Sequence, residues 1–279
     1  MKFLETKLFS AAILIMIPVL FIYDDIFSGN YLNQILLFIL PLIWPGLAHG
    51  SLDISIAKKY GLITNRNQTF IFVFIYILIP FIFFILWLSF PDTFFIIFLI
   101  LSIIHFGISD SILNKERSNV FEIPLRGILV ISLPFQFHLE KTIEIFSFFL
   151  VDKEFIDKKI PFFYFLNIFL ISWIIIFFIK NISSIFSNLN YSVFIIEFSL
   201  LFFCFWYFEP LLSFFIYFCF LHSTRHLIDE MFNLDLKLNE LIIKTIPMTL
   251  LTLIFFLGVL IFFEDESNYI NISYIVIGL

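Results

Sequence analysis

The sequence predicts an all-α protein, a polytopic integral membrane bundle of about nine to ten transmembrane helices. Of its 279 residues, 61% are hydrophobic and only 14% are charged. A soluble domain of this length could not bury so much apolar surface, because globular chains of average composition are far more polar. The apolar residues also form long uncharged runs, and a run of about 20 residues is enough to cross a bilayer as a helix. We therefore expect residues 1–279 to form a single membrane-embedded domain.

The first half of the chain contains four predicted spans, at residues 8–23, 33–49, 69–90 and 93–109. No small-residue cleavage site follows the first run, so we interpret it as a retained span rather than a removed signal peptide. Prolines interrupt the second and third runs. Membrane helices tolerate proline when neighbouring groups bind the freed carbonyls, so these runs still predict spans.

The second half contains one irregular candidate, residues 127–150, which Pro134, His138 and several charged residues interrupt. Clean spans are predicted at 160–179 and 191–208, and further spans at 211–228 and, with Pro247 in its first turn, at 245–263. Apolar residues between 231 and 241 recur at helical spacing between charges, which indicates a helix lying in the membrane interface. The last run, from Tyr269 to Leu279, is too short to cross a bilayer.

The basic residues of the loops predict the orientation of the bundle. If the N-terminus is cytoplasmic, twelve of the 16 Lys and Arg residues lie inside and four lie outside. This asymmetry agrees with the usual excess of basic residues on the cytoplasmic side. It places the loops at 49–68, 110–126 and 226–244 in the cytoplasm, provided that residues 127–150 cross the membrane fully. We expect the protein in the cell inner membrane, with the second, fourth and eighth spans all running from outside to inside.

Four of the five histidines lie at the ends of those three spans. His49 ends the second span, His105 ends the fourth, and His222 and His226 end the eighth. Residues four apart lie on one face of a helix, so the last two can bind a single metal ion. Polar groups this close to hydrocarbon are expensive and usually serve a function. The fifth histidine, His138, is expected to have a structural role.

The donor types narrow the choice of metal. Imidazole suits zinc, copper, iron or nickel. Cys204 and Cys219 lie inside apolar runs and are expected to pack in the core, so no thiolate cluster supports a closed structural zinc site. Four neutral nitrogens around iron would leave positions open for dioxygen.

Liganding imidazoles usually donate their second N–H to a carboxylate or carbonyl, which fixes the tautomer. Asp53 lies one helical turn from His49 and can serve it if the helix continues through Gly50. Glu197 lies about two turns inside its span, at a depth from which it can reach the histidines. We expect Asp53 or Glu197 to accept such a bond, and Asp110 to serve a neighbouring element or to cap its helix. The acidic residues after the last histidine are expected to face the interface: Asp229 and Glu230.

The histidines belong to three motifs, His-Gly-x-x-Asp at 49–53, His-Phe-Gly-x-Ser-Asp at 105–110 and His-x-x-Arg-His at 222–226. Together and in this order they resemble the bacterioopsin-related Brp/Blh family of membrane-embedded β-carotene 15,15′-dioxygenases. The resemblance extends from about residue 40 to the end of the chain. It implies a catalytic domain in which His49, His105, His222 and His226 hold iron(II), Fe(2+). It also implies that dioxygen cleaves the central double bond of β-carotene to give two molecules of retinal.

Other functions make different demands on the sequence. Another carotenoid or isoprenoid enzyme of the membrane would use the same site. A b-type haem protein needs histidines in facing pairs, and a membrane di-iron desaturase needs more histidines than the five present. A proton-coupled transporter would use Glu197 and the histidines, and its signature would be internal repeats with broken helices. Nucleic-acid binding has no basic stripe to support it.

Overall fold

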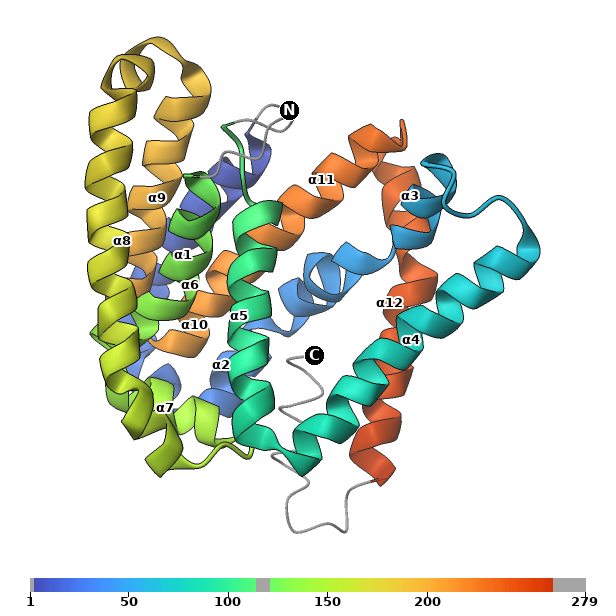
Figure 1. Ribbon diagram of the computed structural model, residues 1–279, viewed down its shortest axis with the longest axis horizontal. Helices are drawn as coiled ribbons and strands as arrows, with labels where there is room; N and C mark the ends of the chain where they lie inside the picture. Colours follow the sequence, from blue (N-terminus) through green and yellow to red (C-terminus); the bar gives the residue numbers. More distant parts are fainter. Residues whose placement is uncertain (1–2, 114–120, 263–279) are drawn as a thin grey trace.

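The computed structural model describes residues 3–113 and 121–262, and the protein in these ranges is built from helices, without strands (Figure 1). The predicted all-α class is therefore confirmed. Seven helical segments in the described ranges are long and apolar enough to cross a membrane. They are Leu4–Phe27, Tyr31–Lys59, Arg66–Ser89, Pro91–Ser109, Lys153–Ser183, Leu189–Tyr207 and Pro210–Asn233. The predicted number of nine to ten is not confirmed, and the predicted run from Tyr269 lies outside the described residues.

The helices follow one another with short connections. In chain order they are α1 (Leu4–Phe27), α2 (Tyr31–Pro41), the π-helix η1 (Leu42–Gly46), the 3₁₀-helix η2 (Leu47–Gly50), α3 (Asp53–Lys59), α4 (Arg66–Ser89), α5 (Pro91–Ser109), α6 (Glu122–Phe137), α7 (Leu139–Ser147), α8 (Lys153–Ser187), α9 (Leu189–Tyr207), α10 (Pro210–Tyr217), the π-helix η3 (Phe218–Ser223), α11 (Thr224–Asn233) and α12 (Leu238–Phe262).

The prediction of one span over residues 127–150 is wrong, because this segment forms two helices. α6 ends at Phe137, and α7 begins only after His138, whose φ and ψ of −138° and 49° leave the helical region. The break follows Pro134, which has no N–H to donate within α6. α6 is only 16 residues long, or about 24 Å. It nevertheless runs back along α5 to the opposite end of the bundle, so the chain changes ends between α5 and α8 (Figure 1).

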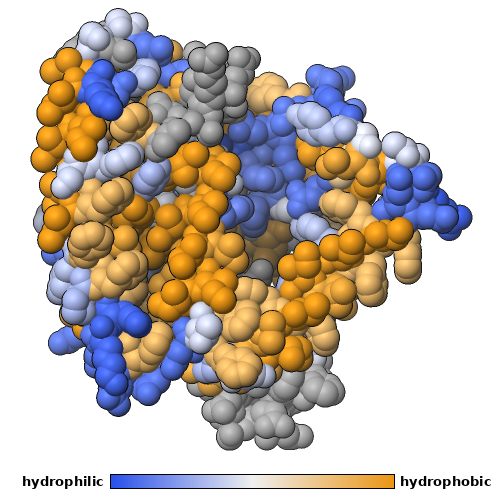
Figure 2. Space-filling model, in the orientation of Figure 1, coloured by the Kyte–Doolittle hydropathy of each residue, from blue (hydrophilic) through white to orange (hydrophobic). Residues whose placement is uncertain are grey.

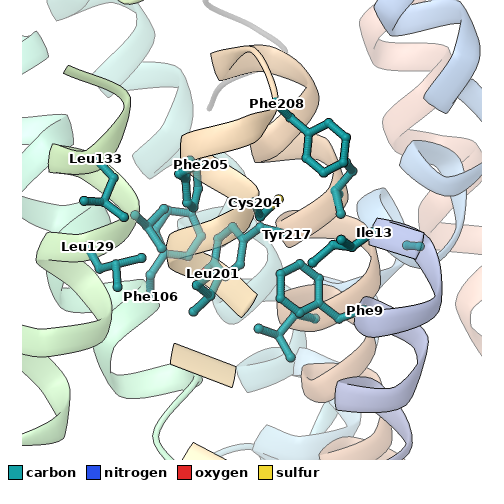
Figure 3. Packing of buried hydrophobic residues seen from close by; sticks show 14 of the residues in the cluster. Phe9, Ile13, Phe106, Leu129, Leu133, Leu201, Cys204, Phe205, Phe208 and Tyr217 are labelled. Atoms are coloured by element: carbon teal, nitrogen blue, oxygen red, sulfur yellow. The ribbon is translucent and has the colours of Figure 1, made fainter. Parts of the chain in front are cut away.

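The core lies where α6 packs against α5, α8 and α9. α6 is buried on most of its surface, from Leu125 to Leu133. Phe106, Leu129, Leu201, Phe205 and Tyr217 come from four of the helices and fill the space between them (Figure 3). Their side chains are nearly fully buried, and such burial is the main source of packing stability in a helical bundle. The core thus holds the end of α5, which contains His105, against η3, which contains His222.

α4 and α12 stand apart from this core on the other side of the molecule (Figure 1). Large apolar side chains of α4 are widely exposed, for example Phe70 at 73% and Ile79 at 61%. A membrane helix presents such residues to lipid. Figure 2 shows a hollow between α5 and this pair of helices, with hydrophobic side chains on its walls and hydrophilic ones over α11 at its floor.

Candidate metal centre

Two of the histidines lie in irregular helical segments. His49 lies in the 3₁₀-helix η2, directly after a π-helix that contains Pro45. His222 lies in the π-helix η3. This segment continues into α11, which contains His226. π-Helical turns are rare and occur frequently at functional sites. His105, in the last turns of α5, and His226, in α11, come from regular helices.

Three of the four histidines converge on one point. One ring nitrogen each from His49, His105 and His222 lies within 4.8 Å of the others. The Nε2 atoms of His105 and His222 are 3.3 Å apart. The ring of His226 lies beside that of His49, with centroids 5.7 Å apart, so it borders the group without belonging to it. The structure therefore brings together three of the four histidines that the sequence places at one depth.

Hydrogen bonds fix which nitrogen each ring presents. The Nδ1 atom of His222 is 3.0 Å from Oδ1 of Asp110, and the other carboxylate oxygen accepts the hydroxyl of Tyr217 at 2.6 Å. The Nδ1 atom of His49 donates to the carbonyl of Gly46 at 2.5 Å. A carboxylate and a carbonyl can only accept, so both Nδ1 atoms carry the proton. The Nε2 lone pairs are then available to bind a cation.

The donor set fits a transition-metal ion. Two nitrogens bound at about 2.1 Å to one tetrahedral ion lie roughly 3.4 Å apart, close to the 3.3 Å between His105 and His222. With its proton held on Nδ1, the Nε2 of His222 has a lone pair to offer rather than an N–H. Imidazole without thiolate suits iron, zinc, copper or nickel. His49 and His105, together with His222, supply the nitrogens that such an ion needs.

The buried charges behind the imidazoles also favour a cation. Among the described residues, five buried carboxylates stand against two buried guanidiniums there. The carboxylates are those of Glu5, Asp110, Glu122, Glu197 and Glu230, and the guanidiniums those of Arg126 and Arg225. Uncompensated buried charge is costly in a medium of low dielectric constant. A divalent ion at the neutral imidazoles would offset the excess of negative charge.

Asp53 has a different partner from the one expected. The helix does not continue through Gly50, because η2 ends there and α3 begins anew at Asp53. The carboxylate instead accepts the hydroxyl of Tyr76 from α4 at 3.0 Å. It is Glu230 that lies next to an imidazole, with Oε2 3.5 Å from Nδ1 of His226. Glu230 is buried rather than facing the interface, so that expectation is wrong.

Glu197 is fully buried in α9, but its hydrogen bonds also go elsewhere. It accepts the hydroxyl of Thr6 at 2.5 Å and a short bond from Arg225, and it pairs with Arg126 at 2.9 Å. Within the described ranges, the carboxylates beside the imidazoles are therefore Asp110 and Glu230. The prediction that Asp110 serves a neighbouring element is confirmed by its bond to His222. A role for Glu197 or Asp53 in activity stays a prediction.

Two further expectations concern residues away from the histidine group. His138 lies at the α6–α7 break, at the far end of α6, where its carbonyl accepts the hydroxyl of Thr142 at 2.8 Å. Cys204 and Cys219 are free and buried, which confirms that they pack in the core. Tyr217 and the Gly46 carbonyl could not be identified from the sequence, because a tyrosine and a main-chain oxygen inside apolar runs belong to no motif.

Comparison with known proteins identifies a family. A family model described as beta-carotene 15,15′-dioxygenase matches residues 40–279, which include all four histidines. No curated protein matches the chain, and no solved structure matches it either.

Proposed function

The chain belongs to the beta-carotene 15,15′-dioxygenase family, and from this membership we propose that it cleaves β-carotene at the central double bond. In this reaction the 15,15′ C=C bond breaks and both atoms of one dioxygen molecule enter the products, giving two molecules of retinal. We propose that His49, His105, His222 and His226 hold iron(II) as the cofactor. The convergence of three of these imidazoles within 4.8 Å is the observation that supports this site best.

Iron(II), when bound, would supply the redox chemistry with dioxygen that no amino-acid side chain provides. The chain's own residues hold and orient the donors. Asp110 and the Gly46 carbonyl keep the protons of His222 and His49 on Nδ1. Glu230 lies in position to do the same for His226. Fixed tautomers and ring orientations reduce the reorganisation that binding requires.

The substrate is an apolar rod dissolved in the membrane, so it reaches the site most directly from lipid. The hollow beside α5 supports this route (Figure 2). His105 is the exposed member of the histidine group, whereas His222 is fully buried. Leu101 and Ile108, one turn from His105 on either side, are more than half exposed and provide an apolar border. We propose that the polyene lies along this border with its central bond at His105.

We further propose that the protein lies in the cell inner membrane with its N-terminus and its histidines near the cytoplasmic surface. His105 lies in the last turns of α5, which ends on the side of the bundle where α1 begins (Figure 1). Lys58 and Lys59 end α3 and Arg66 begins α4 at the same end, in agreement with the excess of basic residues inside. A long rod cleaved at its centre must therefore lie tilted or close to the inner leaflet.

Proton-coupled transport has less support. A proton carrier needs a carboxyl group that can gain and lose a proton within the membrane. Glu197 is instead held in ion pairs with Arg126 and Arg225. Both pairs are buried, so protonating Glu197 would remove a carboxylate partner from each of two buried guanidiniums.

The test is expression in cells that make β-carotene. We expect the orange colour to fade while retinal accumulates as the sole aldehyde, and His105→Ala to abolish both effects. Purified protein should contain one iron per chain. Undiminished β-carotene in cells that hold folded, iron-loaded protein would refute the proposed reaction.

A further inference from the structure

Five buried charged residues next to the histidine group form a ring of contacts that closes through the backbone following Asp110. They are Asp110, Glu122, Arg126, Glu197 and Arg225, and each is at most 2% exposed. They come from the end of α5, from α6, from α9 and from α11, elements far apart in the sequence. We call them the carboxylate–guanidinium ring.

One half of the ring holds the chain that follows α5. Glu122 accepts the main-chain N–H groups of Ile112 and Leu113, both at 2.9 Å, and the hydroxyl of Ser111 at 2.7 Å. Arg126, one turn further along α6, donates to the same carboxylate at 2.7 Å. Glu122 thus fixes the three residues that directly follow Asp110.

The other half holds Asp110 from the opposite side. Arg126 pairs with Glu197 at 2.9 Å, and Glu197 accepts a short hydrogen bond from Arg225. Arg225 in turn donates to the main-chain carbonyl of Asp110 at 2.8 Å. The carboxylate of Asp110 remains free of these contacts and binds His222 and Tyr217. Arg225 therefore holds the main-chain carbonyl of Asp110, and Glu122 holds the three residues that follow it. The side chain of Asp110 is left to orient the imidazole of His222.

Buried ion pairs such as those in this ring add little net stability to a fold. Replacing buried ion pairs by apolar residues of similar volume is often neutral or stabilising, because desolvation offsets the attraction. Arg225 lies in the sequence between His222 and His226, so the ring also fixes the position of the helix that carries both. The arrangement is better suited to fixing a position than to adding stability.

We propose that the carboxylate–guanidinium ring is a positioning device for the metal centre, and that Arg225 is its principal positioning residue. It acts through Asp110, which holds His222 in the orientation that binds the ion. This inference rests on the proposed function, since it requires a metal at the histidines. Lysine cannot replace Arg225 here, because an ammonium group lacks the planar fork that reaches a carbonyl and a carboxylate together.

The experiment is a titration of the purified, metal-free protein with Co(II), followed by its visible absorption. We expect Arg225→Lys and Asp110→Asn each to weaken Co(II) binding by about 10–100-fold. If Arg225 acts through Asp110, the double variant should bind no more weakly than the weaker single variant, because the two effects share one path. Lys141→Met is the matched control, since it breaks the Lys141–Glu209 pair at the other end of the bundle. It should leave Co(II) affinity unchanged.

Each outcome separates this inference from the proposed function. Folded Arg225→Lys with wild-type Co(II) affinity, or with only a lower unfolding temperature, would overturn the positioning role and leave the metal centre intact. Fully additive losses in the double variant would also overturn it. If the wild-type protein bound no Co(II), the proposed metal centre itself would be wrong. Should Arg225→Lys not fold, Glu122→Gln carries the same expectation of weaker Co(II) binding with the fold retained.

Discussion

Replacing Gly127 by alanine should disrupt the metal centre although Gly127 is not a ligand. Gly127 lies on α6 where this helix crosses α5 at very close range. A Cβ atom at this position would lie 1.9 Å from the carbonyl oxygen of Ile103. A second contact of the same kind, 2.4 Å from a Cβ on Gly107 to the carbonyl of Ile123, shows that the two backbones touch along both helices. Small residues allow such close packing between membrane helices.

The structure sets the size of the effect. The two helices must separate by about 1.1 Å before the contact of 1.9 Å reaches the 3.0 Å below which real Cβ atoms are essentially never found. Ile103 lies two residues before His105 on the same helix, so a shift of α5 moves His105 with it. Metal ligands keep their distances to within about 0.2 Å. Overpacking of this kind also costs about 1–3 kcal/mol of unfolding free energy.

Co(II) titration and thermal unfolding of Gly127→Ala measure both consequences. We expect weaker Co(II) binding, a lower unfolding temperature and less retinal in cells that make β-carotene. The matched control is Gly258→Ala on α12, where a Cβ atom meets nothing within 4 Å. It should bind Co(II) as the wild type does and should not be destabilised, because alanine favours helix over glycine. Wild-type stability and affinity in Gly127→Ala would refute the reasoning from close packing.

Three further predictions concern the metal ligands, the pH dependence of stability and the membrane topology. His105→Ala should lose iron and activity while His138→Ala should keep both; the reverse result, from metal analysis, would contradict the ligand assignment. Burial alone would raise the pKa of Glu209, but hydrogen bonds from Lys141 and its other donors hold that pKa below its usual range. Its stabilising effect should therefore be present at neutral pH and be lost on acidification, so unfolding of Glu209→Gln should depend less on pH. Finally, a membrane-impermeant thiol reagent added outside the cell should label Asp25→Cys but not Lys58→Cys, and labelling of the latter would invert the proposed topology.

The sequence by itself predicted the class of the protein, which the structure confirms, and it identified the histidines of the candidate site. Uncharged apolar runs predict membrane helices because an unsatisfied backbone is too costly in lipid. The basic loops then place three spans in one direction, and this brings His49, His105 and His222 to one end without any knowledge of packing. These signals are local, and the structure agrees with the predicted helices and with the convergence of these three histidines. The division of segment 127–150 into two helices could not be predicted. The helix α6 is stabilised by its burial among three neighbouring helices rather than by its own composition.

Only the tertiary structure decided how the imidazoles are held. Asp53 was the nearest carboxylate in sequence to His49, yet the break at Gly50 turns it toward Tyr76. The carboxylate that orients His222 is Asp110, 112 positions away in the chain. No periodicity or spacing connects two such residues. Their contact depends on the close crossing of α5 and α6, on the π-helical turn at His222 and on buried ion pairs from other helices. Those features exist only once the whole bundle has packed.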